Sequence, residues 1–497
     1  MLSLIVFLPL LAALGLYLVP RRAERFVRVA GIAVTGVVLL LVVVLWLGYR
    51  TPPAGHFAFE ERLRWIPSLG AGYHLGVDGL SLPLVAMSAL LFFVCAIYSW
   101  REKRRIREYT ALFLLLEAVS IGVFLALDLV LFFVFWDLSI VGMYFVIALW
   151  GHGDRRRSAL KFFLYTFLGS LALLLGIIGL YVFASPATFD MVELTLQTPL
   201  ATAGAAAPLV MLGLVIGFGV KTPVVPVHTW LPPAHTDAPA TGSAILAGVL
   251  LKMGTYGFLR VAMPMLPDTW RDWSWALIAL GVVSVLWGAL VALAQRDFKR
   301  MIAYTSVNHM GYILLAIGAA GLVADSPQQA RELAITGAVV QMVSHGLITG
   351  ALFLLAGVLH DRGGTYDLEA WGGLANPAPV FAGATAIAAF ASLGLPGLSG
   401  FIAEFHIFLG SMRPAPIPTA LAFLGILLTA ALFLIAVQKL LLGPVRGRSE
   451  GVRDLRSHEA IAVLPLLALS GVIGIFPRFL LDIVEPASRA VTELVAR

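Results

Sequence analysis

Two lysines lie within stretches of sequence that are otherwise almost entirely apolar. Lys252 stands in ILAGVLLKMGTYGFL, about eleven residues into an apolar window at 241–263, which places it roughly 16 Å from either end of a helix. A lysine at that depth of a membrane helix is expected to face protein or water and to have a function. Lys221 precedes the proline-rich segment TPVVPVHTWLPP. The alternative for Lys221 is a helix-end lysine that reaches the membrane surface.

Three carboxylates also lie in apolar surroundings. Asp137 stands in LVLFFVFWDLSIVGMYFVIALW and Glu117 in LFLLLEAVSIGVFLAL. Because a lone buried carboxylate would protonate, Asp137 is expected to have a cationic partner, for which Lys221 and Lys252 are the candidates. Glu117 is either a second titrating group or a neutral contact between helices. Glu404 follows a glycine- and proline-rich break in LGLPGLSGFIAEF.

Histidines and one further lysine complete the set of candidate groups. His309 (SVNHMGY) and His345 (QMVSHGLITG) fall in consecutive apolar windows, and His228 lies in the proline-rich segment. The alternative for each histidine is a hydrogen bond between packed helices. Lys439 lies late in its window and either contributes to the set or reaches the membrane surface.

These residue types suit proton transfer. The proton affinity of lysine and histidine changes readily on desolvation, and a nearby carboxylate favours the protonated lysine. A row of such groups across a membrane can take a proton from one side and release it on the other. The sequence therefore predicts a proton- or ion-translocating membrane protein with Asp137, Lys221, Lys252 and Glu404 as the central groups. His309, His345, Glu117, Lys439 and His228 are the predicted relay.

The composition agrees with a membrane protein. Of 497 residues, 60% are hydrophobic and 12% are charged, against about a quarter charged in a soluble domain. The arginines lie in short clusters between apolar runs, which argues against nucleic acid as a partner. The single cysteine, Cys95, excludes an intramolecular disulfide and a cysteine-ligated iron–sulfur cluster. No phosphate-binding or dinucleotide-binding motif is present, so no cofactor and no metal are expected in this chain.

Apolar windows near the 20 residues that a helix needs to cross a membrane occur fourteen times. The sequence therefore predicts an all-α integral membrane protein, a single transmembrane domain over 1–497. The windows lie at 2–19, 28–48, 78–98, 110–127, 129–149, 160–184, 207–225, 241–263, 273–294, 301–321, 332–358, 379–411, 417–443 and 460–482.

The basic residues predict how the spans are oriented. Twenty-one Lys and Arg residues lie in the odd-numbered loops, against ten in the even-numbered loops and the C-terminal tail. By the positive-inside rule the odd loops are cytoplasmic and both termini face outward.

Two spans are interrupted: span seven by Pro223, Pro226, Pro232 and Pro233, and span twelve by Pro396, Gly397 and Gly400. Backbone broken at membrane depth is tolerated only where protein or water surrounds it, and paired breaks indicate the translocation site of an inverted-repeat fold. Two unrelated kinks are the alternative. The predicted organisation is spans 1–3 (1–108), a first five-helix repeat (109–263, spans 4–8), a second repeat (273–443, spans 9–13), and span 14 with a tail (459–497).

Five segments carry a resemblance to a known family. They are GVDGLSLP (76–83), the continuous block from Val220 to Arg260, IAYTSVNHMGY (302–312), QMVSHGLITGALFLLAG (341–357) and LGLPGLSGFIAEF (393–405). In this order they resemble the antiporter-like proton-translocating membrane subunits of respiratory complex I. Glu404 stands where the L- and N-type branches and Mrp antiporters typically have lysine, so the M-type branch is favoured.

The resemblance implies roles for individual residues. Lys221 would be the pumping lysine paired with a carboxylate of the fifth span, Lys252 the connecting lysine, His309 and His345 relay groups, and Glu404 the exit-side carboxylate. The family normally has glutamate where this chain has Asp137, and the missing methylene withdraws the carboxylate by roughly 1.3 Å.

The resemblance also implies an assembly. NADH, FMN, iron–sulfur clusters and quinone would be bound by other subunits, and the partners would be L-type, N-type and small K-, J- and A-type membrane subunits in a bacterial inner membrane. The alternatives are a Mrp-type cation/proton antiporter, a membrane subunit of a membrane-bound hydrogenase, and an inert scaffold.

Overall fold

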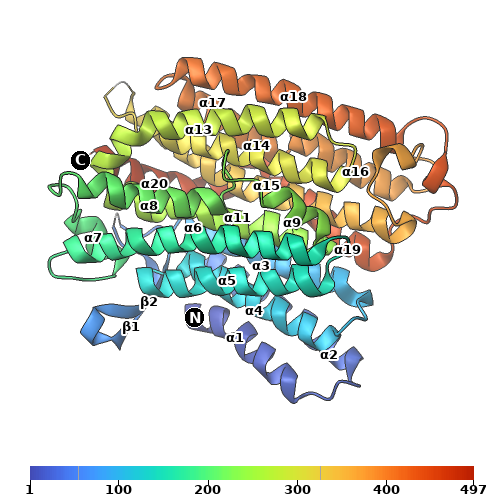
Figure 1. Ribbon diagram of the computed structural model, residues 1–497, viewed down its shortest axis with the longest axis horizontal. Coiled ribbons are helices and arrows are strands. Elements are labelled where there is room, and N and C mark those ends of the chain that lie inside the picture. The colour runs from blue at the N-terminus through green and yellow to red at the C-terminus, as the bar shows by residue number, and fades with distance from the viewer. Residues whose placement is uncertain (54, 325, 497) are drawn as a thin grey trace.

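The computed structural model describes residues 1–53, 55–324 and 326–496, and most of them are helical. Figure 1 shows the long helices lying roughly parallel, from α1 at one edge of the molecule to α18 at the other. The helices are α1 (Leu2–Gly15), α2 (Glu24–Gly48), α3 (Ser81–Tyr98), α4 (Ile106–Leu125), α5 (Leu129–Trp150), α6 (Arg155–Phe183), α7 (Met191–Gln197), α8 (Ala206–Lys221), α9 (Leu231–Asp237), α10 (Ala240–Ile245), α11 (Leu251–Gly257), α12 (Met263–Met265), α13 (Pro267–Leu293), α14 (Phe298–Ala319), α15 (Gln328–Gly363), α16 (Pro379–Ser392), α17 (Ser399–Met412), α18 (Pro416–Leu441), α19 (Ser457–Ile475) and α20 (Arg478–Ala496).

Membrane-spanning character is clear for much of this bundle. Within the described residues, ten helices are long and apolar enough to cross a membrane, and three shorter apolar helices accompany them. Each of the fourteen predicted windows coincides with helix over most of its length. The multi-pass membrane fold is confirmed, whereas the number of fourteen crossings, the inverted repeats and the domain ranges stay predictions.

Glycines allow the long helices to pack backbone against backbone. A Cβ built at Gly281 or Gly311 would lie 2.6 or 2.7 Å from backbone atoms of the facing helix in the α13–α14 pair. Between α15 and α17, a Cβ at Gly410 would lie 2.3 Å from the amide nitrogen of Ala334. Small residues permit this close approach in membranes, where lipid is as apolar as the helix surface. Tight packing therefore fixes α14, α15 and α17, which carry His309, His345 and Glu404.

Two elements at one end of the bundle differ from the all-α prediction. Strands β1 (Ala58–Ile66) and β2 (Ala71–Val77) form an antiparallel hairpin. Successive side chains of a strand point to opposite faces, and each of these strands is too short to give an apolar window of membrane-spanning length.

The segment predicted as a tail after span fourteen is the amphipathic helix α20, whose apolar residues recur with helical spacing. The last window, predicted to reach residue 482, ends earlier because α19 stops at Ile475, before Pro477.

The first predicted break lies between α8 and α9. Helix α8 ends at Lys221, and nine residues of turn follow before α9 begins at Leu231. Protein groups satisfy the freed backbone: Trp230 Nε1 donates to the Val220 carbonyl at 3.0 Å, and the Val225 amide donates to Ser284 Oγ at 3.0 Å. The backbone can depart from helical geometry here because protein groups surround it and satisfy its hydrogen bonds.

The second predicted break separates α16 from α17. Helix α16 ends at Ser392 and α17 begins at Ser399. Gly394 and Gly397 in the linker have φ of +76° and +92°, a region that side chains other than glycine rarely adopt. The Ser399 hydroxyl lies 2.8 Å from that of Ser344 and 2.7 Å from that of Ser470, so serines tie the start of α17 to α15 and α19.

The span that carries Lys252 is not a uniform α-helix. Two π-helical segments, Leu246–Leu250 and Phe258–Ala262, flank α11. A π-helical turn leaves carbonyl groups without their usual partners and is frequent at functional sites. The whole span is buried within the bundle.

Candidate proton-transfer site

Lys221 lies at the C-terminal end of α8, with its side chain 1% exposed. Its ammonium donates to Ser139 Oγ on α5 at 3.0 Å and lies 5.0 Å from the centre of the Trp136 ring. The Ser139 hydroxyl in turn donates to the Trp136 carbonyl at 2.6 Å. A cation at a helix C-terminus and over an aromatic face is favoured. The end of the broken helix thus holds a lysine without a directly bonded carboxylate.

Asp137 is half-buried on α5 and accepts a hydrogen bond from Ser170 Oγ on α6. Among the ion pairs within 4.0 Å in the described residues, none joins Asp137 to Lys221 or to Lys252. The expectation of a lysine partner for Asp137 therefore does not hold as a direct contact. Serine hydroxyls are the hydrogen-bond partners of both Lys221 and Asp137. The aspartate side chain, shorter than the glutamate normal in the family, is consistent with this arrangement.

Lys252 is fully buried at the start of α11. Its ammonium donates to the Ala247 carbonyl at 2.5 Å, and it lies 2.6 Å from His345 Nδ1 on α15. Ala247 belongs to the preceding π-helical segment, whose altered hydrogen bonding makes that carbonyl available to the side chain. The irregular helix therefore creates a polar site for the lysine that it carries.

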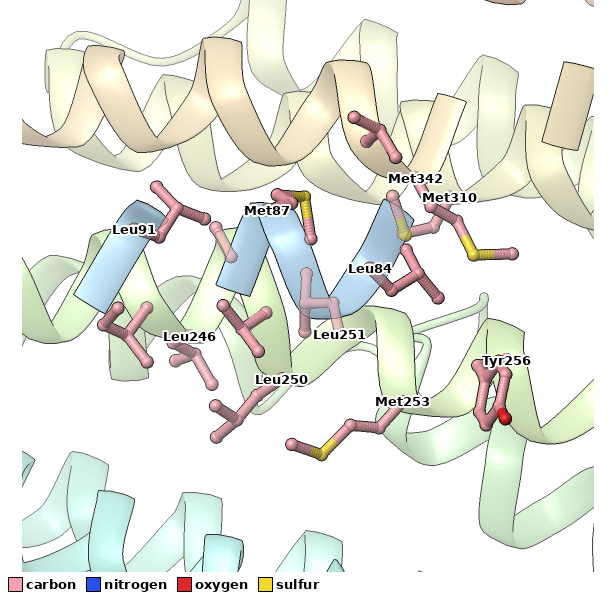
Figure 2. Close-up of a cluster of buried hydrophobic side chains, with 14 of the residues drawn as sticks. Leu84, Met87, Leu91, Leu246, Leu250, Leu251, Met253, Tyr256, Met310 and Met342 are labelled. Carbon is pink, nitrogen blue, oxygen red and sulfur yellow. The ribbon is translucent and has the colours of Figure 1, made fainter. Parts of the chain in front are cut away.

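Apolar side chains pack on the helix that carries this lysine. Figure 2 shows a buried cluster that contains Leu250, Leu251 and Met253, the neighbours of Lys252 in sequence, together with Met87 of α3 and Met342 of α15. The neighbouring chains approach closely here: a Cβ built at Gly346, next to His345, would lie 2.1 Å from Met87 Sδ, and one at Gly248 would lie 2.5 Å from Leu91 Cδ1. In so apolar a site, a change of protonation at Lys252 acts strongly on its polar neighbour.

The polar row continues from His345 through the second half of the chain. The rings of His345 and His309 have centres 5.3 Å apart. His309 Nε2 lies 3.2 Å from Ser392 Oγ, while Gln341 Nε2 lies 3.0 Å and Glu404 Oε1 4.0 Å from His309 Nδ1. A cavity of about 10 Å³ lies among these residues, close to the space that one water molecule needs.

Three predicted relay residues lie outside this row. Glu117 is fully buried on α4, and neither of its carboxylate oxygens has a hydrogen-bond partner within the described structure. His228 lies in the linker between α8 and α9 and is 6% exposed. Lys439 lies near the end of α18, where its ammonium contacts Glu369 Oε1 at 2.5 Å with both side chains more than one-third exposed. The position of Lys439 favours the alternative of a lysine at the membrane surface.

Sequence reasoning missed several polar groups. Lys299 and Arg260 had been assigned to loops, yet Lys299 is fully buried and Arg260 is 8% exposed. Arg260 donates to Asp78 Oδ1 at 2.6 Å. The signal for Arg260 was present in the sequence, because it falls inside the window at 241–263. Ser139 and Ser170, which hold Lys221 and Asp137, carry no sequence signal that separates them from other serines in membrane helices.

The arrangement places several buried groups that can exchange protons along the bundle. Lys221, Lys252, His345, His309 and Glu404 lie on five different helices and all are buried. Close contacts join Lys252 to His345, and single-water distances join His309 to Glu404. Such groups exchange protons without a metal or a bound coenzyme.

Known proteins with similar sequences cover almost the whole chain. A family model described as "NADH:quinone oxidoreductase/Mrp antiporter, TM" matches residues 126–442. NADH-quinone oxidoreductase subunit M of Rickettsia felis is 38% identical, with 97% of this chain and 96% of that protein covered. F(420)H(2) dehydrogenase subunit M of Methanosarcina mazei is 37% identical, with 99% and 98% covered.

Solved structures show the same fold. A chain of respiratory complex I from Thermus thermophilus superposes with a TM-score of 0.90 at 32% identity, and all of both chains is covered. A chain of the Mrp complex from a Dietzia species has a TM-score of 0.86 at 22% identity, with 100% of this chain and 99% of that chain covered. The resemblance noted in the sequence is thereby confirmed: this chain belongs to the NADH:quinone oxidoreductase/Mrp antiporter transmembrane family.

Proposed function

We propose that this chain is the M-type proton-translocating membrane-arm subunit of a complex I-type NADH–quinone oxidoreductase. The observation that carries the proposal is the buried row from Lys221 and Lys252 through His345 and His309 to Glu404. Lysines and a carboxylate enclosed by a membrane bundle are costly unless they act. Among the relatives, several at 36–38% identity are named subunit M of NADH-quinone oxidoreductase.

The chain moves protons and takes no part in electron transfer itself. Electron transfer in other subunits, which hold NADH, FMN, iron–sulfur clusters and quinone, changes the charge or hydration at one end of the row. Lys221 then gives up its proton toward Lys252, and the second half passes a proton through His345 and His309 to Glu404. Each transfer moves one proton and exchanges the charge of two neighbouring groups.

The proposed setting follows from the family and from the arginine bias. The chain spans a bacterial plasma membrane fourteen times, with both termini outside and two inverted repeats formed by spans 4–8 and 9–13. L-type, N-type and small K-, J- and A-type subunits are its partners in the bilayer. The Methanosarcina relative makes a different electron donor the principal alternative, and co-purification of the subunits that bind the donor distinguishes the two.

Substitution of Lys221 by alanine in the assembled complex tests the function. Proton pumping is expected to fall, because Lys221 is the basic side chain in the last turn of α8, while oxidation of NADH by an artificial acceptor continues in the hydrophilic arm. Lys103→Ala, which removes an exposed lysine, is the matched control. Pumping that is unchanged in Lys221→Ala would contradict the proposal.

A further inference from the structure

A second group of titratable side chains, three buried and two partly exposed, lies at the end of the bundle that we assign to the cytoplasm. Lys299 lies near the start of α14, His235 is on α9, and His360 is on α15. His152 lies in the loop after α5, and Tyr366 lies in the loop after α15. His152 and His235 come from the first half of the chain and the other three from the second. The group therefore lies at the seam between the two halves.

The outer part of this group is a stack of rings. The rings of His152 and His360 have centres 4.7 Å apart, and Tyr366 stacks on His360 at 4.7 Å. Both histidines are partly exposed, and His152 Nε2 has no partner in the described structure. Lys299 Nζ lies 5.1 Å from the centre of the Tyr366 ring, on the buried side of this stack. The stack thus connects solvent to a buried ammonium group.

Lys299 has no carboxylate within 4.0 Å among the described ion pairs. Its ammonium donates to the carbonyl of Ala238, the residue after α9, at 2.5 Å. It also donates to the carbonyl of Thr236, in the last turn of α9, at 3.4 Å. Asp297 and Asp237 act on this lysine only through space and make no direct bond to it. A fully buried ammonium group whose hydrogen bonds go only to carbonyls is costly to keep charged. An ammonium group that can release its proton has a clearer use in such a place.

His235 lies next along the same path. It is fully buried, its ring stacks on Phe353 of α15 with centres 4.5 Å apart, and neither ring nitrogen has a protein partner. Buried ring nitrogens of this kind normally have a partner, and water is the usual one where protein supplies none. Phe353 is eight residues along α15 from His345, a rise of about 12 Å. His235 therefore lies between the outer stack and the site of Lys252 and His345.

We propose that His152, His360, Tyr366, Lys299 and His235 form the entrance through which cytoplasmic protons reach Lys252. This inference rests on the proposed proton-translocating function. A proton from bulk water binds His152 or His360, and passes to a Lys299 that has given up its own proton. Lys299 then releases a proton through water to a free nitrogen of His235, from which it reaches His345 and Lys252. Each step moves one proton and leaves its donor one charge lower.

Two substitutions of Lys299 separate proton transfer from a structural role. Lys299→Arg keeps a cation beside the carbonyls that end α9 but does not release a proton, because the guanidinium stays charged. Lys299→Met removes the charge. Both variants are expected to slow pumping by about tenfold or more in inverted membrane vesicles, with NADH oxidation by an artificial acceptor unchanged. Wild-type pumping in Lys299→Arg would overturn the proposal, because it would show that only the positive charge is needed. Lys103→Arg, on an exposed loop at the same end, is the control.

A rescue experiment tests the ring stack independently, and decides the question if the Lys299 variants do not assemble. His152→Gly combined with His360→Gly is expected to slow pumping severalfold. Imidazole added to the cytoplasmic face should restore it, whereas pyrazole, a ring of the same size that is a much weaker base, should not. No loss of pumping, or equal rescue by both rings, would overturn the proposal.

The same vesicles distinguish failure of this inference from failure of the proposed function. Lys221→Ala is assayed in parallel with the entrance variants. If it abolishes pumping while Lys299→Arg and the histidine pair leave pumping unchanged, the chain pumps protons and they enter elsewhere. If Lys221→Ala has no effect either, the proposed function itself is wrong.

Discussion

The two broken helices hold their ionisable groups in different ways. At the first break the group is a cation, Lys221, which is the last residue of α8 and is bonded to the hydroxyl of Ser139. At the second break the group is a carboxylate, Glu404, which comes after the linker on α17 and lies 4.0 Å from His309. The first linker has nine residues and contains prolines, whereas the second has six and contains two glycines of positive φ.

This difference has an electrostatic consequence. A lysine that gives up its proton and a carboxylate that accepts one both become neutral. Net movement of a proton from the first half to the second therefore removes two buried charges of opposite sign, and the reverse movement restores them. Because buried charge is costly, the state in which both groups are charged differs in energy from the state in which both are neutral. Lys252 and its neighbouring histidines connect the two groups.

Loss of the connection should have the largest effect. Lys252→Met keeps a long unbranched side chain but removes the amino group that contacts His345 at 2.6 Å. Pumping is expected to fall about a hundredfold or more, although Lys221 and Glu404 remain in place. Proton uptake by reconstituted vesicles measures the rate of pumping. Pumping within a few-fold of wild type would show that the halves exchange protons by another route.

The first break can be tested at its unusual carboxylate. Asp137→Asn removes the charge while keeping the contact with Ser170 possible, and should slow pumping about tenfold. Asp137→Glu adds a methylene and moves the carboxylate toward the reach normal in the family, so it should pump at least as fast as wild type. The comparison of the two variants in the assembled complex isolates charge from reach. Equal loss in both would mean that the serine-bonded aspartate geometry itself is required.

The second break can be tested at its two glycines. Gly394 and Gly397 both have positive φ, but a Cβ at Gly394 would lie 2.4 Å from Glu404 Oε2, whereas one at Gly397 would meet nothing within 4 Å. Each alanine substitution should cost about 1–2 kcal/mol through backbone strain. Only Gly394→Ala should also slow pumping, because it displaces the carboxylate. Thermal unfolding and pumping rates separate the two effects, and identical pumping in both variants would argue against a role for the position of Glu404.

The smallest effect is expected at Lys439, a lysine near the end of α18. Lys439→Gln removes an exposed ion pair with Glu369, and exposed pairs contribute little. Pumping should stay within about twofold of wild type. A loss comparable with that of Lys221→Ala would return Lys439 to the relay and make the two halves more alike than their geometry indicates.

Much of this arrangement could be predicted from the sequence. The depth of Lys252 follows from its position in an apolar window, and both breaks follow from proline and glycine at membrane depth. These features depend on local composition and on the lack of water in the bilayer. The π-helical segments around Lys252 left no such signal, because their residues are ordinary apolar helix formers.

The contacts between helices could not be predicted in the same way. Whether Asp137 meets a lysine or a serine depends on how α5 is rotated against α6 and α8, which no single window reports. Lys299 follows a polar turn and counts as a loop residue by hydropathy, yet packing of α14 against α9 buries it. Helix α20 was missed because a search for apolar windows overlooks a helix with only one apolar face.

Helix α20 also bears on how the protein is made. Its first turns lie so close to the segment before α3 that a Cβ at Gly79 would meet the Ile483 carbonyl at 2.0 Å. Arg271 on α13 and Arg331 on α15 donate to the carbonyls of Val495 and Thr492 at 2.6 and 3.3 Å. One helix thus joins early and late parts of the chain, and it is synthesised after the helices that it contacts. Closure of this end of the bundle therefore waits until α20 itself has been synthesised.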